Sequence, residues 1–111
     1  MTRPTPTLTC YLAEWYGAEA IAQPIDATVA RLDTGVVALR AEGAFVRLLV
    51  ALTARTDQVL YSVFAATSPD AVRRACERAG FPAERVTADV EARVMPNDFH
   101  QDPFPPEGGA R

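Results

Sequence analysis

The sequence predicts a single α+β domain whose strands and helices follow one another in the order βαββαβ. Two stretches, at about 25–43 and 69–79, repeat apolar residues every three or four positions, which is typical of amphipathic helices. Four shorter stretches, at 7–15, 45–55, 59–66 and 86–94, are alternately or continuously apolar, as β-strands are. With 111 residues, the chain has the length of one domain.

The first half of the chain is expected to form a strand, a helix and a second strand. In the strand at 7–15, one face carries Leu8, Cys10 and Leu12, and the other carries Tyr11, Ala13 and Trp15. The helix begins near Ile25 and ends before Gly43, and its apolar face consists of Ile25, Val29, Leu32, Val36 and Leu39. Gly35 lies inside this helix, where glycine costs about 1 kcal/mol relative to alanine. The strand at 45–55 is expected to place Val46, Leu48, Val50 and Leu52 on one face.

The second half repeats this pattern with clearer boundaries. The segment 59–66 is apolar on both faces, which is typical of a central strand. Ser68 is a good N-cap, Pro69 suits the first helical position, and Gly80 suits the left-handed C′ position after the helix. Phe81 follows as C″, within reach of Cys76. The last strand, at 86–94, is expected to place Val86, Ala88, Val90, Ala92 and Val94 on one face.

This order of elements predicts the ferredoxin-like fold. Right-handed crossovers place both helices on one face of a four-stranded antiparallel sheet, with the first and third strands in the centre. If Leu8, Cys10 and Leu12 face the helices, the opposite face has an apolar centre formed by Tyr11, Trp15, Leu49 and Ala51. An apolar patch of this kind marks an interface or a ligand groove, so the sequence predicts a homodimer formed sheet to sheet.

The charge and hydropathy of the chain argue against nucleic acids and membranes as binding partners. The net charge is −3 and all 11 basic residues are arginines, which argues against a nucleic-acid-binding surface with clustered Lys and Arg. The sequence contains no apolar run of the roughly 18–20 residues needed to cross a membrane, and its N-terminus has no apolar signal region. We therefore expect a cytoplasmic protein with a flexible arm at 1–6, a folded domain at 7–95 and a proline-rich, flexible tail at 96–111.

Three groups of residues are candidates for chemistry. Cys10 and Cys76 lack the C-x-x-C spacing of a metal or redox site and are expected to be free thiols in the core. The tail carries Asp98, His100 and Asp102, which would hold a metal only if the tail became ordered, so a solvated tail without metal is the main expectation. Glu14 and Tyr16 end a central strand, where they would serve as acid and base at the mouth of a cleft or simply lie exposed. No cofactor motif is present.

The stretch "DQVLYSVFAATSPDAVRRACERAGFPAERV", at 57–86, resembles a family of small ferredoxin-like domains, mostly bacterial, without an assigned function. The similarity extends from about Tyr11 to Val94. It implies a dimer of the α+β barrel type, joined through the open face of the sheet. One branch of this family is described as nickel-binding through histidine-bearing positions, whereas the single histidine of this chain, His100, lies outside the matched region.

Two functional hypotheses follow. The first is a small cytosolic homodimer that binds a small molecule or a metal, as the resemblance implies. The alternative is a cofactor-independent monooxygenase- or isomerase-like enzyme with an apolar pocket, a hypothesis that rests on fold analogy alone. A pocket between sheet and helices that holds Glu14 or a buried tyrosine would favour the enzyme, and a packed sheet face would favour binding.

Overall fold

The computed structural model describes residues 8–95, so the predicted arm at 1–6 and tail at 96–111 lie outside the described residues. The elements are β1 (Thr9–Tyr16), a short 3-10 helix η1 (Ala18–Ile21), α1 (Ile25–Ala41), β2 (Val46–Ala54), β3 (Val59–Ala66), α2 (Pro69–Arg78) and β4 (Arg85–Val90). Apart from η1, this is the predicted order.

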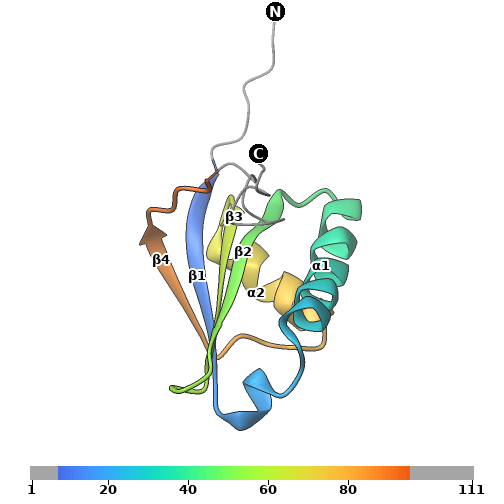
Figure 1. Cartoon of the computed structure of the whole chain (residues 1–111). Helices are drawn as coiled ribbons and strands as arrows, with labels where there is room; N and C mark the ends of the chain where they lie inside the picture. Colours follow the sequence, from blue (N-terminus) through green and yellow to red (C-terminus); the bar gives the residue numbers. More distant parts are fainter. Residues whose placement is uncertain (1–7, 96–111) are drawn as a thin grey trace, which may run out of the picture.

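The four strands form one antiparallel sheet in the order β2-β3-β1-β4, so β1 and β3 are central, as predicted. Figure 1 shows α1 and α2 against one side of this sheet, while the other side has no helix on it. The arrangement confirms the ferredoxin-like α+β fold. No helix within residues 8–95 is long and apolar enough to cross a membrane.

Helix α2 begins and ends where its local signals predict. The Ser68 hydroxyl accepts a hydrogen bond from the Ala71 amide at 3.1 Å, and Pro69 opens the helix. At the other end Gly80 has a φ of +73°, and the Phe81 amide donates to the Cys76 carbonyl at 2.9 Å. This pair of features is the Schellman motif, which satisfies carbonyls that the last turn leaves unpaired.

The side chains of β1 face the opposite way from the prediction. Tyr11, Ala13 and Trp15 lie between sheet and helices, with exposed fractions of 6%, 0% and 1%. The Trp15 indole stacks on Phe81, with ring centroids 4.8 Å apart, and its Nε1 donates to the Phe81 carbonyl at 3.0 Å. These large rings fill the space beneath the helices, and the smaller side chains of Cys10 and Leu12 therefore face away from them.

Strand β2 changes face in its middle because of a β-bulge. Its register against β3 shifts between Leu48 and Val50, so Leu49 is the extra residue. Val46 is buried on the helix side, whereas Val50 and Leu52 are 43% and 50% exposed on the other side. The prediction that Val46, Leu48, Val50 and Leu52 share one face is therefore wrong.

Strand β4 contains a second irregularity. Cys10 pairs with Val90 but Leu12 pairs with Thr87, so β4 carries one additional residue in this interval. Asp89, within it, adopts the left-handed conformation with a φ of 59°. The bulge separates Val86 and Val90 onto opposite faces, and the strand ends at Val90 rather than at 94 as predicted.

The two helices approach each other most closely at Gly35, and this explains the glycine inside α1. A Cβ atom at this position would overlap the carbonyl oxygen of Ala75 in α2 and come within 2.9 Å of the Ala79 amide nitrogen. Both atoms belong to the backbone of α2, so neither can move aside without shifting the helix. Close helix packing therefore offsets the unfavourable helix propensity of glycine.

Replacing Gly35 by Ala should lower the free energy of unfolding by at least about 2 kcal/mol, because the methyl group overpacks the α1–α2 contact. Helix propensity alone would change stability in the opposite direction, by about 1 kcal/mol. Urea denaturation followed by circular dichroism measures the difference. The Asp33→Ala variant, on an exposed position of α1, is the control and should stay within about 0.5 kcal/mol of the wild type. A Gly35→Ala protein as stable as the wild type would contradict the packing argument.

Both cysteines are free thiols, as predicted, but only one belongs to the core. Cys76 belongs to the buried face of α2, whereas Cys10 is half-buried on the side of the sheet without helices, which corrects its predicted place. Burial, and to a lesser extent the charge of Glu77, raises the pKa of the Cys76 thiol from 9.0 to about 12.

This shift predicts a loss of stability at high pH. Between pH 9.0 and about 12, the unfolded thiol loses its proton while the folded Cys76 keeps it. The free energy of unfolding should therefore fall with rising pH, by at most about 1.4 kcal/mol per pH unit from this group. Denaturation at a series of pH values checks this. Cys76→Ala should flatten the slope relative to Cys10→Ala, and equal slopes in the two variants would argue against it.

Candidate functional site: the open face of the sheet

The face of the sheet without helices, called the open face below, is built from alternate residues of all four strands. Cross-strand pairing arranges these residues in rows. From β2 to β4, the rows are Arg47–Ala65–Cys10–Val90, then Val50–Val63–Leu12–Thr87, then Leu52–Tyr61–Glu14–Arg85, and finally Ala54–Val59–Tyr16 without a partner on β4. Neighbours within a row are close enough for their side chains to interact.

The middle of the open face is apolar. Leu12 and Val63 occupy adjacent central strands and are half-buried by their neighbours. Val50 and Leu52 on β2 are 43% and 50% exposed, although both are aliphatic. If this face of the sheet only contacted water, we would expect polar side chains at these positions. The open face instead presents a contiguous aliphatic surface.

A polar network crosses the β1–β4 side of this surface. The Tyr16 hydroxyl donates to Glu14 Oε1 at 3.0 Å, and Arg85 Nε lies 3.9 Å from Glu14 Oε2. The chain after α2 holds this end of β1 in place, because the Glu84 amide donates to the Glu14 carbonyl and the Glu84 carboxylate accepts from the Tyr16 amide, both at 2.9 Å. A residue far away in sequence therefore fixes the backbone that carries Glu14 and Tyr16.

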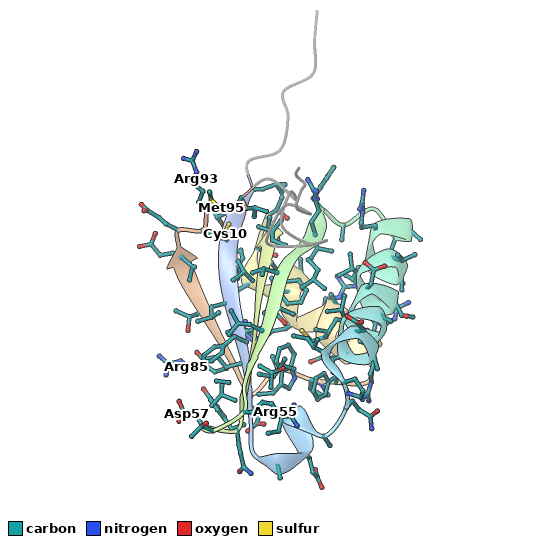
Figure 2. The ribbon with its side chains drawn as sticks, viewed as in Figure 1. Cys10, Arg55, Asp57, Arg85, Arg93 and Met95 are labelled. Atoms are coloured by element: carbon teal, nitrogen blue, oxygen red, sulfur yellow. The ribbon has the colours of Figure 1, made fainter. Side chains whose placement is uncertain are left out.

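The members of this network differ in exposure. The Glu14 side chain is only 14% exposed, whereas that of Arg85 is 66% exposed. Figure 2 shows Arg85 projecting from β4 at the edge of the sheet. The carboxylate is thus sheltered and the guanidinium is accessible from outside.

The Tyr16 hydroxyl keeps its proton more firmly than an ordinary tyrosine. Partial desolvation, the hydrogen bond to Glu14 and the negative charge of Glu14 all raise its pKa, while Arg85 acts in the opposite direction. Tyr16 therefore acts as a hydrogen-bond donor at neutral pH. Glu14, which has about four lone-pair sites, can still accept hydrogen bonds from another molecule.

The predicted site residues lie in three different parts of the chain. Glu14 and Tyr16 come together on the open face, outside the space between sheet and helices. Three of the four predicted interface residues lie on the helix side of the sheet and not on the open face: Tyr11 and Trp15 are in the core, and Ala51 pairs with the buried Ser62. The fourth, Leu49, is the extra residue of the β2 bulge and has no partner on β3. Asp98, His100 and Asp102 lie outside the described residues. Within residues 8–95, no group of three or more His, Cys, Asp and Glu side chains is placed to hold a metal.

One signal in the sequence could have corrected the orientation of β1. Glu14 belongs to the same period as Cys10 and Leu12, so placing that face beneath the helices would also bury a carboxylate. Arg85, Leu52 and Val50 were missed for another reason, because their place depends on the ends and bulges of β4 and β2.

A shallow depression lies at the other end of the open face, beside Cys10. Its lining consists of Leu8, Thr9, Cys10, Asp89, Val90, Glu91, Ala92, Arg93 and Val94. In Figure 2, Arg93 and Met95 lie near Cys10 at this end, while Arg85 lies near the opposite end with Arg55 and Asp57 of the β2–β3 turn. The depression is wide open to solvent.

Comparison with known proteins identifies the class of fold. No protein-family model matches the chain, and no curated protein matches it significantly. Among solved structures, the crystal structure of SCO4226 from Streptomyces coelicolor A3(2) is similar, with a TM-score of 0.56 and 19% sequence identity. The match covers 75% of this chain and 99% of that chain. At this identity the likeness supports the ferredoxin-like α+β fold and nothing further.

The Glu14–Tyr16 contact can be tested by titration. Replacing Glu14 by Gln should lower the pKa of Tyr16 toward its ordinary value, because the negative charge that favours the protonated phenol is removed. NMR of ring-labelled tyrosine across a pH series measures this pKa, and Tyr16→Phe assigns the signal. Glu84→Gln is the control, since Glu84 accepts from the Tyr16 amide and not from its hydroxyl. A Tyr16 pKa that is unchanged in Glu14→Gln would contradict the network.

Proposed function

We propose that the protein works as a homodimer, formed through the open faces of two sheets, that binds a small molecule beside Glu14. The observation that carries the proposal is the aliphatic centre of the open face, with Val50 and Leu52 43% and 50% exposed. Covering such a surface with an identical surface removes both from water at once. The resulting assembly is a dimeric α+β barrel.

Complementarity of the rows favours one arrangement of the two copies. A two-fold axis that runs along the strands, between β1 and β3, places Tyr61 of one copy opposite Glu14 of the other, because these residues share a row. An axis that runs across the strands at the level of Ala13 places the aliphatic Leu12 opposite Glu14 instead. The first arrangement gives the sheltered carboxylate a second phenol donor, and a carboxylate buried against leucine would be costly. We therefore favour the axis along the strands.

A small organic molecule suits the polar network better than a metal does. The network offers a single carboxylate, a phenol that keeps its proton and a guanidinium, and only the carboxylate is a ligand that metals commonly use. All three groups are instead effective in hydrogen bonding to an organic ligand. The aliphatic residues beside them would contact its apolar part.

A catalytic role is the second candidate. The hydrogen bond between Tyr16 and Glu14 supports it, because an acid and a base in contact are a minimal arrangement for proton transfer. We place it second because Glu14 lies on the open face, whereas the space between sheet and helices is filled by Trp15, Phe64, Leu32 and other core side chains.

Leu52→Glu should convert the dimer into a monomer, because it places a charge inside the proposed interface at a desolvation cost of several kcal/mol. Light scattering or sedimentation velocity at about 100 µM protein detects the change for any dimer of micromolar affinity. The matched control is Val37→Glu, which adds the same charge at a position that is 58% exposed on α1. A wild-type protein that is monomeric at this concentration would refute the homodimer, as would a Leu52→Glu variant that remains dimeric.

A further inference from the structure

We propose that the ligand of the open face is an α-amino acid with an aliphatic side chain. Its ammonium group would bind Glu14, its carboxylate would bind Arg85, and its side chain would lie on Leu12 and Val63. The inference rests on the proposed small-molecule site, and it adds the chemical class of the ligand.

Charge balance is the first argument. Glu14 and Arg85 are direct cross-strand partners, so one negative and one positive group stand side by side, next to the aliphatic Leu12 and Val63 and with Tyr16, Tyr61 and Thr87 as polar neighbours. In the proposed sheet-to-sheet dimer, a ligand with a single charge would satisfy one of them and leave a net charge inside the interface, which is unfavourable. An α-amino acid zwitterion carries one charge of each sign on two groups attached to the same carbon, and it leaves the site neutral.

The state of the Glu14–Arg85 pair is the second argument. The 3.9 Å between Arg85 Nε and Glu14 Oε2 is too long for a hydrogen bond, so the pair is not closed. With the Arg85 side chain 66% exposed, the pair contributes little by itself and is easily rearranged. Its guanidinium can bind a carboxylate through two parallel hydrogen bonds, and Oε2 can accept from an ammonium group.

The surroundings of the pair indicate the side chain of the ligand. The Tyr16 hydroxyl donates a hydrogen bond to Glu14 Oε1, and this bond fixes the direction in which the carboxylate points. Leu12 precedes Glu14 on the same face of β1, and Val63 lies beside Leu12 on β3. Arg85 lies on β4 and Val63 lies on β3, and these strands are two strand spacings, about 10 Å, apart. An amino acid with a short branched side chain fits between these two residues. The lining is aliphatic at these positions, so leucine, isoleucine or valine fits better than a polar amino acid.

Isothermal titration calorimetry with three related probes tests the ligand class. L-Leucine carries both charges, 4-methylpentanoate lacks the ammonium group, and 3-methylbutylamine lacks the carboxylate. We expect leucine to bind at least about tenfold more tightly than either analogue, since each loses charge-assisted hydrogen bonds. Alanine should also bind more weakly, because it lacks the side chain that contacts Leu12 and Val63.

Variants assign the two charges. Arg85→Gln should weaken leucine binding by at least about tenfold and leave 3-methylbutylamine unaffected, and Glu14→Gln should weaken leucine binding but not 4-methylpentanoate binding. Arg47→Gln is the matched control, because it removes the same charge from the β2 edge of the same face, and it should bind leucine as the wild type does. Circular dichroism of each variant verifies folding.

The outcomes separate this inference from the proposed homodimer. Equal affinity for leucine and either analogue, or no leucine binding by a protein that light scattering shows to be dimeric, would overturn the ligand class alone. Leucine binding that depends on Arg85 and Glu14 in a monomeric protein would support the ligand class and refute the dimer. A monomer that binds none of the probes would refute both.

Discussion

The contact between Trp15 and Phe81 fixes the orientation of the central strand, and most of the architecture depends on it. The two rings stack at 4.8 Å with their planes 9° apart, and the indole N–H is satisfied by the Phe81 carbonyl. Arg31 completes the assembly from α1, with its guanidinium 5.0 Å from the Phe81 ring centre and hydrogen bonds to the carbonyls of Ala79 and Gly80. One cluster thus joins β1, the end of α2 and α1.

Because side chains alternate along a strand, this cluster also decides what the open face can be. With Trp15 beneath the helices, Tyr11 and Ala13 must lie there too, and Leu12, Glu14 and Tyr16 must lie on the other side. The bulge at Leu49 then moves Val50 and Leu52 onto that same side. The apolar centre and the Glu14 network are therefore consequences of packing on the opposite face of the sheet.

The elements that sequence reasoning predicted well are those with local signals. Ser68, Pro69 and Gly80 mark the two ends of α2 through backbone chemistry that involves only near neighbours, and the structure confirms each of them. The apolar residues of β1 do not by themselves decide which face is buried, because both faces contain them, and only Glu14 indicates in the sequence that the face of Cys10 and Leu12 lies outside. The orientation of β1 depends on Phe81, which is 66 residues away in sequence. The bulges in β2 and β4 also depend on pairing between strands, so the composition of the open face and the place of Arg85 had no local signal.

The charged residues Glu14 and Arg85 on the open face bear on the role proposed for that face. If the open face served only for the proposed self-association, an apolar residue at position 14 would suit it better, because burying a charged side chain in an interface carries a desolvation cost. Glu14 is instead held by the Tyr16 hydroxyl and by the backbone of Glu84, which is the arrangement expected of a group that must point in one direction. Only positions 10, 12, 14 and 16 of β1 reach this face. In the proposed dimer with its ligand, assembly and recognition share one strand of each copy: Leu12 contributes to both, and Glu14 and Tyr16 contribute to recognition.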